Sequence, residues 1–167
     1  MVAPKNKELR PGMIAITKLG NGKYALAYEM VGESYQPIYL KFANSLDGWI
    51  PEETGKIIRS SDGVGLGSAP AIVWTPDGGE CGTLIVAGGY MDSASIDYKC
   101  DWFISFDYGE TFVNVRNPIQ IRNVEGTIGY KPGIFVDESG KIYYVNNPRE
   151  VGKTRDFRFV FSRIKIY

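Results

Sequence analysis

Residues 10–29 read RPGMIAITKLGNGKYALAYE, and they contain two apolar runs separated by the turn Gly20-Asn21-Gly22. β-Branched and aromatic runs on either side of a Gly/Asn turn are typical of an antiparallel hairpin. The pattern that begins at Pro11 starts again at Pro70 and at Pro132, which makes the repeat about 60 residues long. Such repeats indicate a propeller or a solenoid, because one small sheet cannot bury both of its faces without a neighbour.

The composition fits a single all-β domain. The 167 residues can build a real core, and 13% aromatic residues with 20 Gly and 9 Pro suit many short strands joined by turns. Lys and Arg together number 19, as do Asp and Glu, so the charge balance predicts neither a nucleic-acid nor a membrane partner. We predict one domain, 1–167, with three repeats at approximately 10–62, 63–123 and 124–167.

The chain contains no histidine, which excludes Ser-His and Cys-His nucleophile systems and zinc sites with imidazole ligands. Any catalysis must therefore use Asp, Glu, Tyr, Lys or Cys, and we expect no metal site and no cofactor. Cys81 and Cys100 fall at opposite ends of one predicted hairpin. Since a disulfide needs Cα atoms within about 7 Å, we expect two unpaired thiols.

Apolar alternation and turn residues predict four strands in each of the first two repeats and three in the last, with no helix longer than a turn. The stretch 63–68, with three glycines, is expected to be a loop. The predicted strands lie near 13–18, 23–29, 37–42, 56–60, 71–74, 83–88, 101–106, 119–122, 133–137, 141–146 and 157–167.

The most specific local motif is Ser105-x-Asp107-x-Gly109-x-Thr111-Phe112, and the segment 45–49, SLDGW, is a shorter version of it. In a turn of this composition the Asp carboxylate accepts backbone N–H groups, the Gly takes a positive φ, and the aromatic residue folds back onto the sheet. We therefore predict a structural rather than a catalytic Asp107. The motif resembles the Asp-box, or BNR repeat, of the sialidase superfamily of β-propellers.

A longer resemblance covers roughly residues 10–146. In the order of its short motifs the chain is similar to exo-arabinanase-type glycoside hydrolases, and most like their C-terminal half. The motifs are RPGM (10–13), LGNGKY (19–24), YE (28–29), SLDGW (45–49), APAIVWTP (69–76), GTLIVAG (82–88) and FDYG (106–109). The resemblance implies a six-bladed propeller that cleaves arabinan from its end with retention, using two glutamates, in a secreted or periplasmic protein. No signal peptide is visible at the start of this sequence. With about three blades, the chain resembles half of such a ring.

Propeller geometry places the loops between second and third strands, and the links between blades, on one face, here called the upper face. Its carboxylates and Arg suit sugar hydroxyls, and its tyrosines suit the apolar faces of sugar rings. From this face we predict substrate binding by Arg10, Tyr90, Asp92, Tyr130 and Lys131. Further residues predicted on this face are Glu29, Glu33, Tyr35, Ser68 and Asn146.

Glu29 ends a strand near the mouth of the predicted channel, and by resemblance it stands where the family has a catalytic glutamate. The alternative is a solvated Glu at a strand end. A retaining glycosidase needs a second carboxyl group about 5–5.5 Å away. Asp92 and Glu33 lie on the right face, but neither is assigned to that role. A single Arg at a strand start disfavours a sialic acid substrate, and the alternative for Tyr130 is a tyrosine that only packs.

Three functions remain open at this point: a glycoside hydrolase acting on an oligo- or polysaccharide, a non-catalytic sugar-binding propeller, and a structural repeat module. The flanking strands near 13–18 and 133–137 are too apolar to face water over a large patch. We therefore expect either a homodimer that closes a six-bladed ring or a chain that is a fragment of a longer propeller.

Overall fold

The computed structural model describes residues 9–33, 36–59, 63, 65–91, 98–116, 133–146 and 160–164. Within these ranges all regular elements are β-strands, and no helix long and apolar enough to cross a membrane occurs there. The strands are β1 (Arg10–Lys18), β2 (Tyr24–Val31), β3 (Ile38–Ala43), β4 (Lys56–Ile57), β5 (Gly67–Thr75), β6 (Thr83–Met91), β7 (Tyr98–Ser105), β8 (Val113–Arg116), β9 (Gly133–Val136), β10 (Ile142–Asn146) and β11 (Val160–Ile164).

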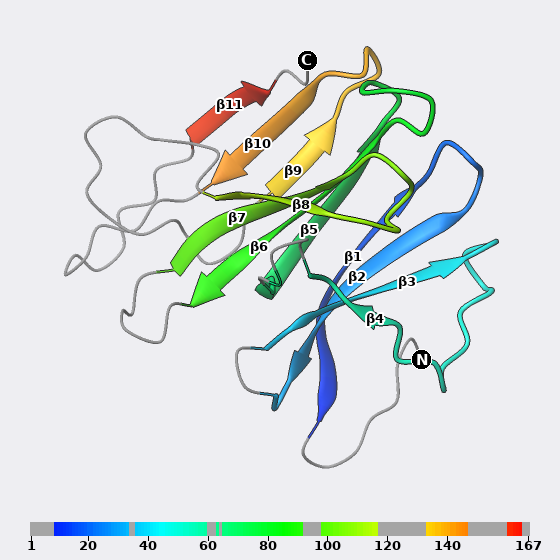
Figure 1. Ribbon diagram of the computed structural model, residues 1–167, viewed down its shortest axis with the longest axis vertical. Coiled ribbons are helices and arrows are strands. Elements are labelled where there is room, and N and C mark those ends of the chain that lie inside the picture. The colour runs from blue at the N-terminus through cyan, green and yellow to red at the C-terminus, as the bar shows by residue number, and fades with distance from the viewer. Residues whose placement is uncertain are drawn as a thin grey trace.

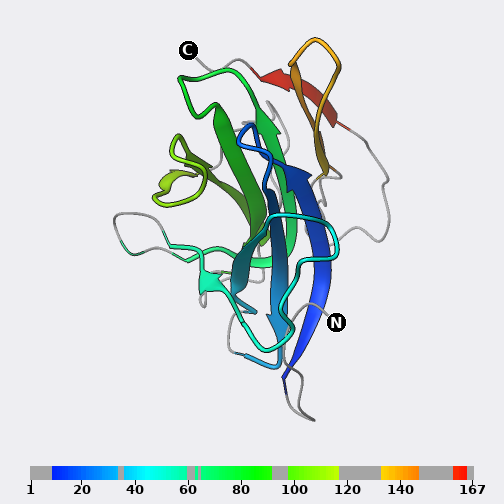
Figure 2. The ribbon, with the colours of Figure 1, turned by 90° about the vertical axis from the view of Figure 1, so that its right-hand side faces the viewer.

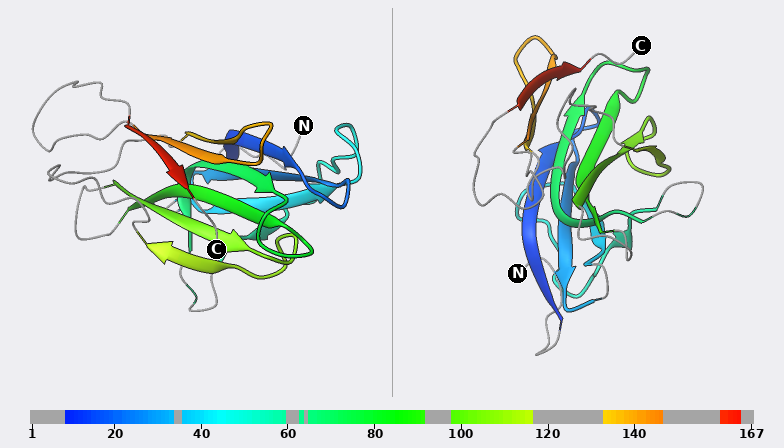
Figure 3. Two further views of the ribbon diagram at one scale, coloured as in Figure 1. Left: turned by 90° about the horizontal axis from the view of Figure 1, so that it is seen from above. Right: turned by 90° about the vertical axis from the view of Figure 1, so that its left-hand side faces the viewer.

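The strands form three antiparallel sheets, each in chain order, which we call blade 1 (β1–β4), blade 2 (β5–β8) and blade 3 (β9–β11). Blades 1 and 3 lie on opposite sides of blade 2 (Figure 1), and β5 contacts both β1 and β9. Figure 3 shows the same stacking from two further sides. Three meanders joined side by side through their first strands confirm the predicted all-β propeller fold with about three blades. The six-bladed ring and the repeat boundaries stay predictions.

One strand lies elsewhere than predicted. The strand that pairs with β7 is β8, Val113–Arg116, whereas the prediction near 119–122 falls outside the described residues. β8 begins directly after the Asp107 turn, so this turn alone connects β7 to β8. The predicted loop at 63–68 also changes, because β5 already starts at Gly67, opposite Gly89.

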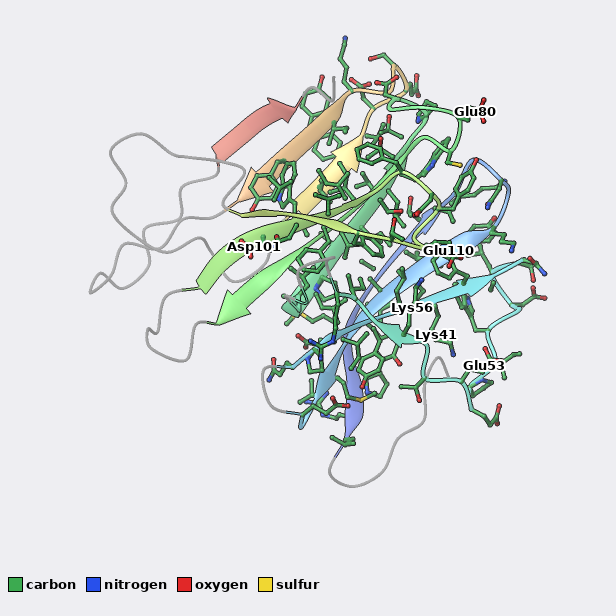
Figure 4. All side chains as sticks on the ribbon, in the orientation of Figure 1. Lys41, Glu53, Lys56, Glu80, Asp101 and Glu110 are labelled. Carbon is green, nitrogen blue, oxygen red and sulfur yellow. The ribbon has the colours of Figure 1, made fainter. Side chains whose placement is uncertain are left out.

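The spaces between the blades hold the core. Between blades 1 and 2 the buried residues include Ile38, Leu66 and Val86, and between blades 2 and 3 they include Trp102 and Tyr144, whose ring centroids lie 5.3 Å apart. Both faces of blade 2 are therefore apolar and covered, as the repeat pattern predicted. At the outer edge, Lys56 of blade 1 pairs with Glu110 of blade 2, with Nζ and Oε2 3.7 Å apart (Figure 4).

The outer flank of blade 1 is partly covered by the chain's own loop, residues 44–55, which crosses this face in Figure 2. Lys41 is buried and donates from Nζ to the carbonyls of Ile50, at 2.6 Å, and Glu53, while the Tyr28 hydroxyl donates to the Thr54 carbonyl. Burial lowers the pKa of Lys41, and Glu53 and Glu52 partly oppose this shift.

Ile14 and Ile16 on β1 remain exposed on this flank, at 52% and 43%. On the side of blade 3 away from blade 2, Phe135 is 47% exposed and stacks on Tyr143 with ring centroids 5.1 Å apart. Among the described residues, both flanks thus expose apolar side chains, and on blade 1 the loop between β3 and β4 covers part of the sheet.

The Asp107 turn has the predicted structural role. Ser105 is buried, its Oγ donates to Asp107 Oδ1 at 2.7 Å, and it accepts the Gly109 N–H at 2.7 Å. Asp107 Oδ1 also accepts the Thr111 N–H at 2.9 Å, and Gly109 has a φ of 92°. Burial raises the pKa of Asp107, but the hydrogen bonds from Thr111 and Ser105 outweigh it and lower the pKa overall.

We expect Asp107→Ala to lower the free energy of unfolding by about 1–3 kcal/mol, because it leaves the Ser105 and Thr111 donors without their acceptor. Urea denaturation followed by fluorescence measures the change. Asp47→Ala is the control, since Asp47 lies in the shorter turn on the surface and its loss should shift the urea midpoint less. A loss of activity at unchanged stability would contradict the structural role.

A second carboxylate, Asp137, organises the turn between β9 and β10. Its Oδ1 accepts the Ser139 hydroxyl at 2.7 Å, the Ser139 N–H at 2.9 Å and the Lys141 N–H at 3.0 Å, and its Oδ2 accepts the Tyr143 hydroxyl at 3.0 Å. The Ser139 hydroxyl is the largest of the contributions that lower the pKa of Asp137 to about 2.

The lowered pKa of Asp137 predicts an acid-sensitive contribution to stability. Since the folded pKa lies below the ordinary value, the contribution is fully present above pH 4 and is lost as the pH falls towards 2. We expect Asp137→Asn to be less stable than the wild type at pH 5, with the difference shrinking by pH 2. Urea midpoints at pH 5, 3 and 2 measure this, and a difference that is constant with pH would refute it.

Candidate functional site

Glu29 lies near the end of β2, on the face that is turned towards blade 2. It is paired in register with Ile38, which belongs to the core between blades 1 and 2. Its neighbour Tyr28 points to the opposite face and pairs with Tyr39 on the outer flank. The period-2 alternation of a strand thus puts Glu29 between two blades.

Two irregularities in the inner strands surround the Glu29 carboxylate. The register of β1 against β2 shifts between Pro11 and Ile14, and that of β5 against β6 shifts between Gly67 and Ala71. Glu29 Oε2 accepts the N–H of Ala69, in the second irregular segment, at 2.8 Å. Glu29 Oε1 lies over Gly12, in the first segment, so closely that a Cβ at Gly12 would be 2.4 Å from it.

The carboxylate of Glu29 is therefore held rather than solvated. The side chain is only 4% exposed, which excludes the alternative of a Glu surrounded by water at a strand end. The position of the carboxylate also differs from the expected one at the channel mouth, because its hydrogen bond to the Ala69 amide holds it in the seam between blades 1 and 2. Its role in catalysis stays a prediction.

Glu33 occupies the other side of blade 1. It accepts the Tyr39 hydroxyl at 3.0 Å, and the Tyr39 ring stacks on Tyr28 with centroids 5.6 Å apart. Burial, followed by the nearby Tyr39 and Glu33, raises the pKa of Tyr28 to about 12. Because these groups lie on the outer flank, the structure does not bring Glu33 to the seam that holds Glu29.

Of the predicted binding residues, Arg10 lies at the start of β1, exposed and paired with Val31 just beyond Glu29. The structure thus brings Arg10 and Glu29 to the same end of blade 1. Tyr90 lies in β6, opposite Lys99, where only its backbone is described. Asp92, Tyr130 and Lys131, together with Tyr35, lie outside the described residues. Ser68 and Asn146 lie in β5 and β10, and only their backbones are described.

Sequence reasoning missed one buried carboxylate, Asp101, which is 4% exposed in β7 (Figure 4). Its signal was a charged residue inside an otherwise apolar strand, YKCDWFIS. The sheet order places β7 two strand spacings, about 10 Å, from β5. Asp101 therefore belongs to the middle of blade 2 rather than to the row of inner strands.

The described residues offer no obvious place for a metal ion, since they contain no group of three or more His, Cys, Asp or Glu side chains suited to hold one. Among them Cys81 is a free thiol in the turn before β6. The Glu29 carboxylate is an ionisable group that can act as an acid, a base or a nucleophile in reach of a substrate, or can simply tie blade 1 to blade 2.

Neither a scan of protein-family models nor a search of curated protein sequences gave a match. Solved structures do resemble the chain. The α-L-arabinanase of Penicillium chrysogenum, complexed with arabinobiose, is 27% identical with a TM-score of 0.71, over 93% of this chain and 42% of that chain. An α-L-arabinofuranosidase mutant of Fusarium graminearum, with an iminosugar inhibitor, is 19% identical with a TM-score of 0.77, over 98% of this chain and 45% of that chain.

A third similar structure is a protein of unknown function from Dyadobacter fermentans, 16% identical with a TM-score of 0.59, over 96% of this chain and 53% of that chain. The chain therefore has a fold like that of β-propeller glycoside hydrolases. It spans less than half the length of the arabinan-type enzymes that it resembles.

Proposed function

We propose that this chain is part of a carbohydrate-active propeller, a retaining, exo-acting glycoside hydrolase of the arabinanase type. The observation that carries the proposal is the Glu29 carboxylate, fixed at the upper end of two neighbouring inner strands. The likeness to an arabinanase holding arabinobiose supports α-linked arabinose oligosaccharides as the substrate class. In this role Glu29 is one of the two carboxyl groups that retention requires.

The second carboxyl group has to lie about 5–5.5 Å from Glu29 in a retaining enzyme. Glu33 faces the outer flank and Asp101 lies in the third strand of blade 2, so neither is suited to the task. The proposal therefore assigns the second group to no described residue of this chain. Binding of the sugar is assigned to Arg10, Tyr90, Asp92, Tyr130 and Lys131, through hydrogen bonds and aromatic stacking.

The proposal includes membership of the sialidase superfamily. It is supported by the Asp107 turn, in which Ser105, Asp107 and Thr111 form one hydrogen-bonded unit before the chain enters β8. The shorter turn at 45–49 has a related bond, since a hydrogen bond from Ser45 is the largest cause of the lowered pKa of Asp47. A secreted or periplasmic location follows from the same family assignment.

A second candidate function is a non-catalytic sugar-binding or structural propeller module that assembles with a second chain. The low exposure of Glu29 favours it, because a carboxylate bonded to the next blade can tie the two blades together without acting on any substrate. Substitution of Glu29 separates the two functions.

We expect Glu29→Gln to lower the rate of arabinose release from arabinan by about 10²–10⁴-fold, the usual contribution of an acid or base. The amide oxygen can still accept the Ala69 N–H, so the melting temperature should stay close to that of the wild type. Glu29→Ala should lose both activity and stability. Glu33→Gln is the matched control, and full activity in Glu29→Gln would leave Glu29 with the structural role alone.

We further propose that two copies assemble around one channel, with blade 1 of each copy meeting blade 3 of the other. Twice the 42% match to the Penicillium enzyme is about 84% of its length, so a second copy comes near to completing such a ring. The exposed apolar residues Ile14, Ile16 and Phe135 supply the flank contacts, and a two-fold axis creates two equivalent seams.

Sedimentation at micromolar concentration should show a species of twice the 18.6 kDa chain mass. Phe135→Glu should convert it to a monomer, because a charge then faces the partner blade. Val113→Glu is the control, since Val113 is 53% exposed on β8, the outermost strand of blade 2, which belongs to neither flank. A soluble wild-type monomer with a cooperative melt would exclude the dimer.

A further inference from the structure

We propose that Gly12 and Ala69 form a seat that fixes the Glu29 carboxylate in one position, and that Gly12 is a positioning residue for the reaction. The geometric part depends only on the contacts between blades 1 and 2. The effect on catalysis rests on the proposed function. Neither residue stands out in the sequence, where Gly12 follows a proline and Ala69 precedes one.

Space, rather than backbone conformation, is the reason for a glycine at position 12. Gly12 is not among the residues with positive φ, so another residue could adopt its conformation. A Cβ there would nevertheless lie 2.4 Å from Glu29 Oε1 and 2.7 Å from both Glu29 Cγ and Val31 Cγ2, closer than real Cβ contacts. The Glu29 side chain occupies the space that a side chain at position 12 would need.

The opposite side of the seat is the amide of Ala69. Pairing between β5 and β6 passes from Gly67 opposite Gly89 to Ala71 opposite Ala87, so the segment between them is outside the regular register. Its backbone N–H is thereby free to donate to Glu29 Oε2. Ala69 has a φ of 37° and is fully buried, an unusual conformation for a residue with a side chain.

The two halves of the seat lie in different blades. Gly12 belongs to β1 of blade 1 and Ala69 to β5 of blade 2, so the carboxylate position depends on how these blades dock. A simple tie between blades needs the hydrogen bond alone. The close fit over Gly12 adds a restraint on the remaining oxygen, which is what a group acting on a substrate requires.

The chain provides a matched control at the other end of the same hairpin. A Cβ at Gly20, which also has no positive φ, would lie 2.4 Å from Trp74 Cζ2. Gly20→Ala therefore introduces an equally close contact, far from the carboxylate and against an apolar ring. Comparing Gly12→Ala with Gly20→Ala separates displacement of Glu29 from general crowding.

The direct readout is the hydrogen-exchange rate of the Ala69 backbone amide, measured by nuclear magnetic resonance. In the wild type we expect slow exchange, which Glu29→Ala should speed up about tenfold or more because the amide loses its acceptor. Gly12→Ala should speed up this exchange in the same direction, whereas Gly20→Ala should leave it unchanged. Unaltered exchange of the Ala69 amide in folded Gly12→Ala would overturn the seat.

If Gly12→Ala alone does not fold, the double variant Gly12→Ala/Glu29→Ala decides the question. The carboxylate and Cγ that crowd position 12 are then absent, so the Gly12 substitution should shift the urea midpoint less than in the wild-type background. An equal shift in the two backgrounds, or a double variant that fails to fold although Glu29→Ala alone folds, would show that Glu29 is not what Gly12 accommodates.

Activity gives the test of positioning. With arabinan as substrate, Gly12→Ala should lower kcat by about 10²-fold at nearly unchanged KM, while Gly20→Ala keeps kcat. A normal kcat in Gly12→Ala would overturn the positioning role. If the wild-type protein releases no arabinose while the exchange of the Ala69 amide behaves as expected, the seat stands and the proposed hydrolase function fails.

Discussion

Every blade of this protein depends on having apolar residues on both faces of a small sheet. In blade 2 the face towards blade 1 carries Val86 and Phe103, and the face towards blade 3 carries Ile85 and Trp102. Neither face can be buried within one four-stranded meander, so the blades have to stack. Stacking through β1, β5 and β9 then fixes which ends of the inner strands lie together.

Because the blades stack, polar groups in the seams between them are buried, and a buried polar group needs a hydrogen-bond partner. Thr75 is fully buried and donates to the Gly140 carbonyl of blade 3, and Glu29 accepts from Ala69 of blade 2. Lys41 is covered instead by its own blade's loop. The candidate site is thus one of the places where a seam satisfies a polar side chain, and it differs from the Thr75 contact in carrying an ionisable acid.

The sequence was informative where structure is local. Turns such as 20–22 and 105–112 and the apolar runs around them predicted the strands to within a few residues, because turn chemistry and alternation act between near neighbours. The position of β8 was not predicted, although this strand pairs with β7 directly after the 105–112 turn. The early start of β5 and the loop over blade 1 were not predicted either, because they depend on contacts such as Gly67 with Gly89 or Lys41 with Glu53 that no pattern of near neighbours records. The burial of Glu29 has the same cause.

The position of Glu29 also limits what this chain can do by itself. The described contacts of its carboxylate come from blades 1 and 2, through Gly12 and Ala69. On the proposed function, retention needs a second carboxyl group at close range, and neither Glu33 nor Asp101 is placed to supply it. Solved enzymes with this fold are more than twice as long as the matched part. Holding Glu29 and supplying the second carboxyl group are consequently separate structural tasks, and the described residues account for the first of them.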